Sequence, residues 1–220
     1  MKEQNNLLQV KCIVENQYGK DVQFFNVSVA PMQVGSIQNA LDALQTNYSS
    51  TLIDVLTSVI SQEMMNSTQQ IPNNQLPNLI QSTVNILSTE LNKEMNGTGT
   101  LTPQIINSCV SNFEKLTQNP RYITPNSAQS VVRSIEHIVG AVIGDSNHEL
   151  KLEGQYQQIA STVSNVYLSV NKSESDSGLK KQIFNVLDQL SSIVMSESAV
   201  GAPETVITTN LVDIVIKVHH

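Results

Sequence analysis

Hydrophobic and polar positions alternate over the first 29 residues of the chain. The alternation places apolar residues on one face of each of two extended segments: Leu8, Val10, Cys12 and Val14, then Phe25, Val27 and Val29. The turn signal Asn16-Gln17-Tyr18-Gly19 separates the two segments, so the pattern predicts a β-hairpin that ends at Pro31. Two strands alone are marginally stable in water, and we therefore expect the hairpin to belong to a larger sheet.

From about residue 35 the hydrophobic period changes from 2 to 3.6 residues, which predicts helices. The first stripe predicts one long helix ending near residue 65, with an apolar face made by Ile37, Leu41, Leu44, Tyr48, Leu52, Val55, Leu56, Val59 and Ile60. Five further stripes run over residues 76–91, 106–116, 131–142, 156–170 and 179–194. Each stripe is one-sided, so about six helices over residues 35–198 should pack on one another as an array.

Proline marks three of the expected boundaries. Thr102-Pro103 and Thr124-Pro125 each combine an N-cap hydroxyl with a proline that the first helical position tolerates. The Gly201-Ala202-Pro203 break ends the last helical pattern, and residues 204–218 are rich in β-branched side chains. We therefore expect strands at the carboxyl end as well, and edges of this kind invite pairing with further segments of the chain or with neighbouring copies.

Composition removes two classes of partner. The net charge is −7, charged residues make up 14% of the chain, and no cluster of Lys and Arg is present. Nucleic acids and anionic membrane surfaces both require a positive patch, so neither is an expected partner. No apolar run reaches the length of a membrane span, and residues 1–30 lack the pattern of a signal peptide.

Five Asn-X-Ser/Thr sequons are candidates for N-glycosylation: Asn26, Asn47, Asn66, Asn96 and Asn171. A chain rich in Asn, Ser and Thr also makes sequons by chance, so they favour a secreted protein without excluding an intracellular one. The missing signal peptide agrees with secretion if the sequence is a piece of a larger ectodomain.

No catalytic, cofactor or metal site emerges from the motifs. The histidines stand in no spacing that is typical of zinc ligands. Gly144-Asp145-Ser146 lies where a helix should end, and a C-cap turn explains it better than a serine nucleophile. Residues 173–178 lack the dense carboxylates of a calcium loop and are better explained as a solvated linker.

Two cysteines, Cys12 and Cys109, both fall on apolar faces. Small thiols at such positions are commonly packing residues. A disulfide between them would join the β-hairpin to the helices, and the sequence leaves both possibilities open.

The order of these elements resembles the receptor-for-egg-jelly (REJ) region of polycystin-like proteins and the related GAIN domain of adhesion receptors. The resemblance rests on the strand pair around Cys12, the "LTP" and "ITPNS" helix starts, and the "VGAPETVITTNLVDIVI" junction. It implies that residues 1–31 are the last strands of an immunoglobulin-like or polycystic-kidney-disease-type β domain. Residues 35–198 would be the helical subdomain, and residues 203–218 the first strands of a following β-sandwich.

The same resemblance implies a non-enzymatic, extracellular structural or adhesion module on a cell surface, including cilia or flagella. Its expected partners are other segments of the same protein, neighbouring copies and other surface proteins. GAIN domains that cleave themselves do so at a His-Leu-Ser/Thr tripeptide, which this chain lacks, so self-cleavage is not expected. The alternatives are an intracellular helical scaffold, with both thiols reduced, and an enzyme, for which no pair of reacting residues can be assembled.

Overall fold

The computed structural model describes ten segments of the chain: residues 7–16, 19–28, 33–66, 71–96, 101–145, 149–152, 154–170, 177–197, 205–209 and 213–216. For residues 7–16, 19–28, 96, 205 and 213–216 it describes the backbone alone. Seven α-helices lie in the described segments: α1 (Val34–Thr46), α2 (Ser50–Met65), α3 (Leu76–Asn96), α4 (Pro103–Thr117), α5 (Pro125–Gly144), α6 (Tyr156–Val170) and α7 (Ser177–Glu197). The predicted mainly helical array is therefore confirmed.

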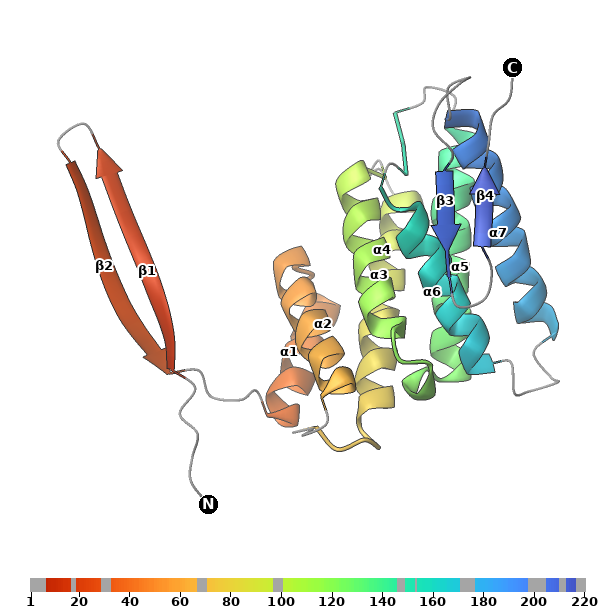
Figure 1. The fold of residues 1–220 in the computed structure, drawn as a ribbon. Helices are drawn as coiled ribbons and strands as arrows, with labels where there is room; N and C mark the ends of the chain where they lie inside the picture. The colour runs from red at the N-terminus through yellow and green to blue at the C-terminus, as the bar shows by residue number, and fades with distance from the viewer. Residues whose placement is uncertain are drawn as a thin grey trace.

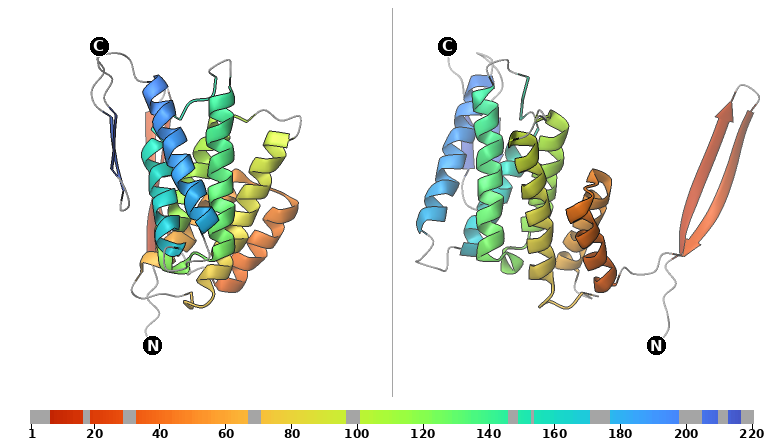
Figure 2. Two further views of the ribbon diagram at one scale, coloured as in Figure 1. Left: turned by 90° about the vertical axis from the view of Figure 1, so that its right-hand side faces the viewer. Right: turned by 180° about the vertical axis from the view of Figure 1, so that it is seen from behind.

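The helices form two rows. One row holds α1, α3, α5 and α7, which contact one another in that order, and the other holds α2, α4 and α6. Figure 2, in its right-hand view, shows the first row side by side. Successive helices thus alternate between rows, as in proteins built from stacked helix pairs, and the array grows in one direction from α1 to α7.

The first predicted helix is wrong in one respect, because two helices occupy its place. Helix α1 ends at Thr46, and Asn47 leaves the helical conformation with φ −140° and ψ 87°. The Ser49 side chain then accepts a hydrogen bond from the Leu52 backbone N–H and caps α2. Tyr48 consequently lies between two helices, and Val55, expected on the apolar stripe, is 49% exposed.

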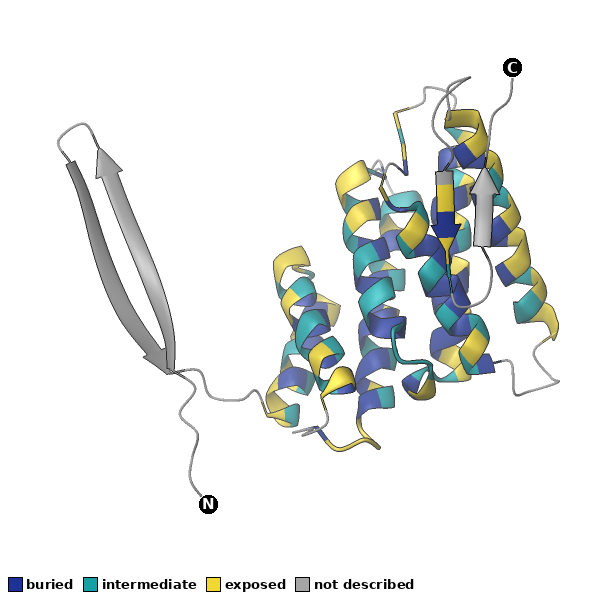
Figure 3. Ribbon diagram, viewed as in Figure 1, coloured by how far each residue is buried: buried dark blue, intermediate teal, exposed yellow. Residues whose placement is uncertain are grey.

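The other apolar stripes pack in a single hydrophobic core that runs through the whole array, with Tyr156, Tyr167 and Leu179 only partly buried against it (Figure 3). The residues predicted to point inward from α4 and α5 are all buried: Ile106, Cys109, Val110, Phe113, Leu116, Val131, Val132, Ile135, Ile138, Val139 and Val142. Both Thr-Pro starts are confirmed. The Thr102 side chain accepts a hydrogen bond from the Ile105 N–H and the Thr124 side chain one from the Ser127 N–H.

Four strands lie in the described part of the chain, in two separate antiparallel pairs. Strands β1 (Leu7–Asn16) and β2 (Gly19–Ser28) form the predicted amino-terminal hairpin, with Val10 opposite Phe25. Strands β3 (Thr205–Thr208) and β4 (Asp213–Ile216) form the second pair. Val29 and the turn at residues 17–18 lie outside the described residues.

The two strand pairs belong to different ends of the array (Figure 1). The β1–β2 hairpin precedes α1, whereas β3 packs on α6 and β4 on α7. Ile207 of β3 is buried against the helices, and its neighbour Val206 is 54% exposed on the outer face. Among the helices that the structure describes, none is both long enough and apolar enough to cross a membrane.

Candidate functional site

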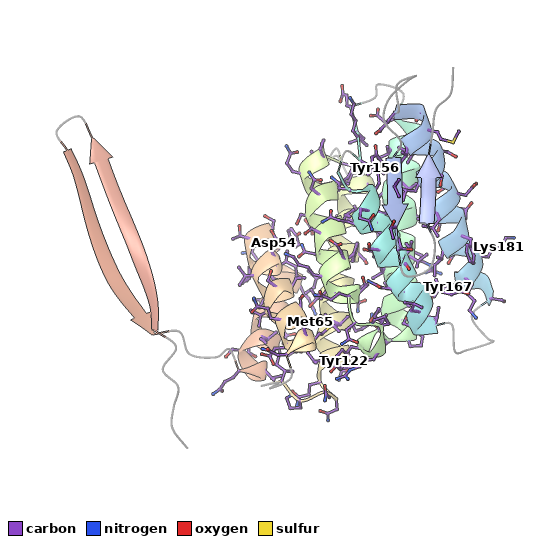
Figure 4. The ribbon with its side chains drawn as sticks, in the orientation of Figure 1. Asp54, Met65, Tyr122, Tyr156, Tyr167 and Lys181 are labelled. Atoms are coloured by element: carbon purple, nitrogen blue, oxygen red, sulfur yellow. The ribbon has the colours of Figure 1, made fainter. Side chains whose placement is uncertain are left out.

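Two adjoining hollows, of about 340 and 370 Å³, lie where the α1–α2 junction meets α3 and α4. Tyr48 and Glu90 line both hollows, and we refer to the pair as the Tyr48 cleft. The cleft lies at the break between α1 and α2, which places Tyr48 between the ends of the two helices. It lies at the α2 end of the array, where Figure 4 labels Asp54, far from Tyr167 and Lys181.

A hydrogen-bonded cluster holds Asp54 at the wall of the cleft. Its Oδ1 atom accepts hydrogen bonds from Asn112 Nδ2 at 2.6 Å and from Ser108 Oγ at 3.2 Å. Asn112 Nδ2 also donates to the Ser108 carbonyl oxygen at 2.9 Å, which fixes the orientation of the amide. Asp54 is therefore held in one position by two neutral donors from α4.

Below this cluster, polar contacts continue along the α2–α4 interface about one helical turn apart. Lys115 Nζ donates to Ser58 Oγ at 3.3 Å, Gln118 Nε2 donates to Ser61 Oγ, and Asn119 Nδ2 donates to the Met64 carbonyl oxygen at 3.2 Å. These contacts keep α2 and α4 in fixed register, and with them the wall of the cleft.

The Tyr48 cleft is acidic. Asp54, Glu90 and Glu94 line it, and Lys93 at its rim lies 3.2 Å from Glu90. No group of His, Cys, Asp and Glu side chains in the described segments could hold a metal ion. The hydroxyl, amide and carboxylate groups of the cleft fit a neutral or cationic polar molecule better than an anion.

Burial is the main influence on the protonation of the Cys109 thiol and the Tyr48 hydroxyl. Burial, with smaller contributions from the carboxylates of Asp54 and Glu90, raises the pKa of the Cys109 thiol to about 12. Burial is also the largest cause of the raised pKa of Tyr48, with smaller effects from Cys109, Glu90 and Asp54. Both groups are therefore protonated at neutral pH, and the thiol is not an activated nucleophile.

The candidate glycosylation sites are only partly placed by the structure. Asn47 and Asn66 are exposed, and each is the residue that directly follows a helix, α1 and α2 respectively. Asn26 lies in β2 and Asn96 ends α3, but their side chains are outside the described residues, as is all of Asn171. The two placed sites are accessible to a modifying enzyme.

The two cysteines are not brought together in the described part of the structure. Cys109 carries a free, buried thiol, and the side chain of Cys12 lies outside the described residues. Cys109 instead lines the Tyr48 cleft from α4. The Cys12–Cys109 disulfide stays a prediction.

The C-cap interpretation is confirmed for Gly144 and Asp145, while Ser146 lies outside the described residues. Gly144 is the last residue of α5, and the Asp145 backbone N–H donates to the Val142 carbonyl oxygen. The Asp145 carboxylate accepts a hydrogen bond from the Leu150 N–H at 2.7 Å and so holds the following segment. Residues 173–176 lie outside the described residues, and Ser177 and Gly178 begin α7.

Sequence reasoning missed the Tyr48 cleft, although one signal for it was present. Asn47 and Ser49, which flank Tyr48, are residue types that favour helix ends and N-caps. Comparison of the chain with protein-family models, with curated proteins and with solved structures finds no match.

Proposed function

We propose that this chain is a non-enzymatic structural or adhesion module of a cell-surface protein. The observation that carries the proposal is the arrangement of the array, which runs in one direction and has a two-stranded β segment at each end. Such an array transmits force between its ends through a continuous core, and its end strands are suited to pairing with further β structure.

The chemistry of the Tyr48 cleft supports a structural role. Its most reactive side chain, Cys109, is held protonated by burial, and the Oδ1 atom of Asp54 is bound by Ser108 and Asn112 of α4. These contacts hold α2 and α4 together, whereas a general base needs an open position beside a substrate. The cluster therefore fits a role in packing.

An extracellular location is supported by the two sequons whose side chains the structure places. Asn47 and Asn66 are both exposed at helix ends, where a glycan would not disturb the core. On this proposal, the resemblance to the REJ and GAIN regions assigns residues 35–198 to a helical subdomain. Residues 1–31 and 203–218 would then belong to flanking β-sandwich domains.

The presence or absence of N-linked glycan tests the proposed extracellular location. The protein isolated from the cells that make it should lose mass on treatment with an N-glycosidase. Asn47→Gln and Asn66→Gln should each remove one glycan. Asn78→Gln is the matched control, because Asn78 is exposed on α3 and Asn78-Leu79-Ile80 is no sequon. A protein without glycan at any site would favour the alternative, an intracellular helical scaffold.

A further inference from the structure

The two edges of the β3–β4 pair are different. Gln157 of α6 binds both backbone groups of Thr208: Gln157 Nε2 donates to the Thr208 carbonyl oxygen at 2.6 Å, and the Thr208 N–H donates to Gln157 Oε1 at 3.2 Å. In a strand, the N–H and C=O of one residue point to the same side. The Gln157 amide therefore occupies the β3 edge in the way that a residue of a neighbouring strand would.

The Gln157 contact also fixes the hydrogen-bonding phase of the pair. Thr208 points its backbone groups away from β4, so Thr208 and Asp213, which lie opposite each other, are a pair without mutual hydrogen bonds. The pattern alternates, so Val206 and Val215 form the next such pair. Asp213 and Val215 accordingly point their backbone groups to the other side of β4, and among the described strands β4 pairs with β3 alone.

The β1–β2 hairpin, for its part, lacks a further strand in the described residues. Each strand has ten residues, and Leu8 lies opposite Val27 and Val10 opposite Phe25, so these four apolar residues share one face. A two-stranded sheet of this length requires a further strand or another covering surface to be stable in water.

The hairpin lies at the opposite end of the array from β4 of its own chain. Only residues 29–33 separate β2 from α1, so the base of the hairpin stays within roughly 20 Å of α1. The row α1–α3–α5–α7 lies between the hairpin and β4, and its three interhelical spacings amount to roughly 24–30 Å. Figures 1 and 2 show the hairpin beyond α1 and the β3–β4 pair at the other end of the array.

We propose that the β1–β2 hairpin of one copy adds to the open β4 edge of a second copy, which produces a four-stranded sheet between them. Because donor and acceptor lie at opposite ends of the array, the contact is heterologous, and repetition produces a head-to-tail chain of copies. The choice of partner rests on the proposed structural role, with a second copy in place of flanking domains as the source of the added strands, and it does not depend on an extracellular location.

The test uses the full chain and sedimentation velocity over a range of concentrations. The wild-type protein should grow in mass as its concentration rises. Val215→Pro removes an outward N–H from the open edge of β4 and should leave a monomer. Val206→Pro is the matched control, since Val206 lies directly opposite Val215 but points its N–H to the α6 side; this variant should assemble like the wild type.

A mixing experiment tests the donor and acceptor separately. A chain with Val10→Pro and Phe25→Pro should lose its hairpin but keep the β4 edge, and should be monomeric alone. Mixed with Val215→Pro, which keeps its hairpin, it should form a dimer and nothing larger.

Three results would each overturn the proposal: a monomeric wild-type protein at every concentration that can be reached, assembly of the hairpin variant on its own, or assembly of Val215→Pro at the wild-type level. If circular dichroism shows that Val215→Pro disturbs the helices, the hairpin variant alone decides, because its changes lie outside the array. None of these readouts depends on glycan, so failure here is separate from failure of the proposed location.

Discussion

Replacing Ile135 of α5 by Ala tests whether the array is held together by one continuous core. Ile135 is fully buried at the centre of the α5 stripe, and α5 contacts α3, α6 and α7. The change removes three carbon atoms from the core, and at roughly 0.8 kcal/mol for each the loss of burial costs about 2.4 kcal/mol. The cavity that remains raises the expected cost to about 3–4 kcal/mol.

The same substitution at an exposed position of the same helix is the matched control. Ile143 of α5 is 54% exposed, so Ile143→Ala should change the free energy of unfolding by less than about 1 kcal/mol, partly because alanine favours the helix. Urea titration followed by far-ultraviolet circular dichroism measures both variants, with unchanged slopes as the sign that only stability has changed. Equal costs for the two variants would refute the burial argument.

Two further predictions concern protonation and helix capping. The pKa of Cys109 is raised from 9.0 to about 12, so the folded protein retains that proton more strongly than the unfolded chain does. Stability should therefore be intact below about pH 9 and fall as the pH rises toward 12, and Cys109→Ala should weaken this dependence in urea titrations. Thr124→Ala should cost more than Thr102→Ala, which should itself cost about 1 kcal/mol, because Thr124 also donates a hydrogen bond to Gln81 of α3 at 2.7 Å. Equal unfolding midpoints for the two variants would show that the Gln81 contact contributes nothing.

Hydrophobic periodicity was sufficient to predict most of the helices. In α5, a 3.6-residue stripe begins with a Thr-Pro start and ends at Gly144, so pattern and boundary signals agree. The first predicted helix failed because the stripe continues in phase across the junction. Tyr48 and Leu52 occupy positions that an unbroken helix would also make apolar, and the cap at Ser49 was the only sign of the break.

Contacts between distant segments were beyond the reach of sequence patterns. The Tyr48 cleft needs Glu90 of α3 and Cys109 of α4 to lie beside the α1–α2 junction, and no local pattern encodes which helices become neighbours. The same holds for Gln157, whose side-chain amide forms hydrogen bonds with the backbone of Thr208 although the two residues are 51 positions apart. The sequence predicted strands with exposed edges, but it could not show that a side chain of α6 covers one of them.

The abundant Asn, Gln, Ser and Thr residues have a structural role where helices pack together. Polar residues of this kind are mostly exposed in folded proteins, yet several of them lie at helix interfaces here. Gln81 Oε1 of α3 accepts hydrogen bonds from Thr124 and Ser127, and Ser134 Oγ of α5 donates to Ser88 Oγ of α3 at 2.9 Å. Neutral donors and acceptors can be buried there at lower cost than charges, and they pair only when the two helices are in register. In this protein the polar interfaces therefore fix which turns of neighbouring helices meet, while the apolar stripes supply the burial that holds the helices together.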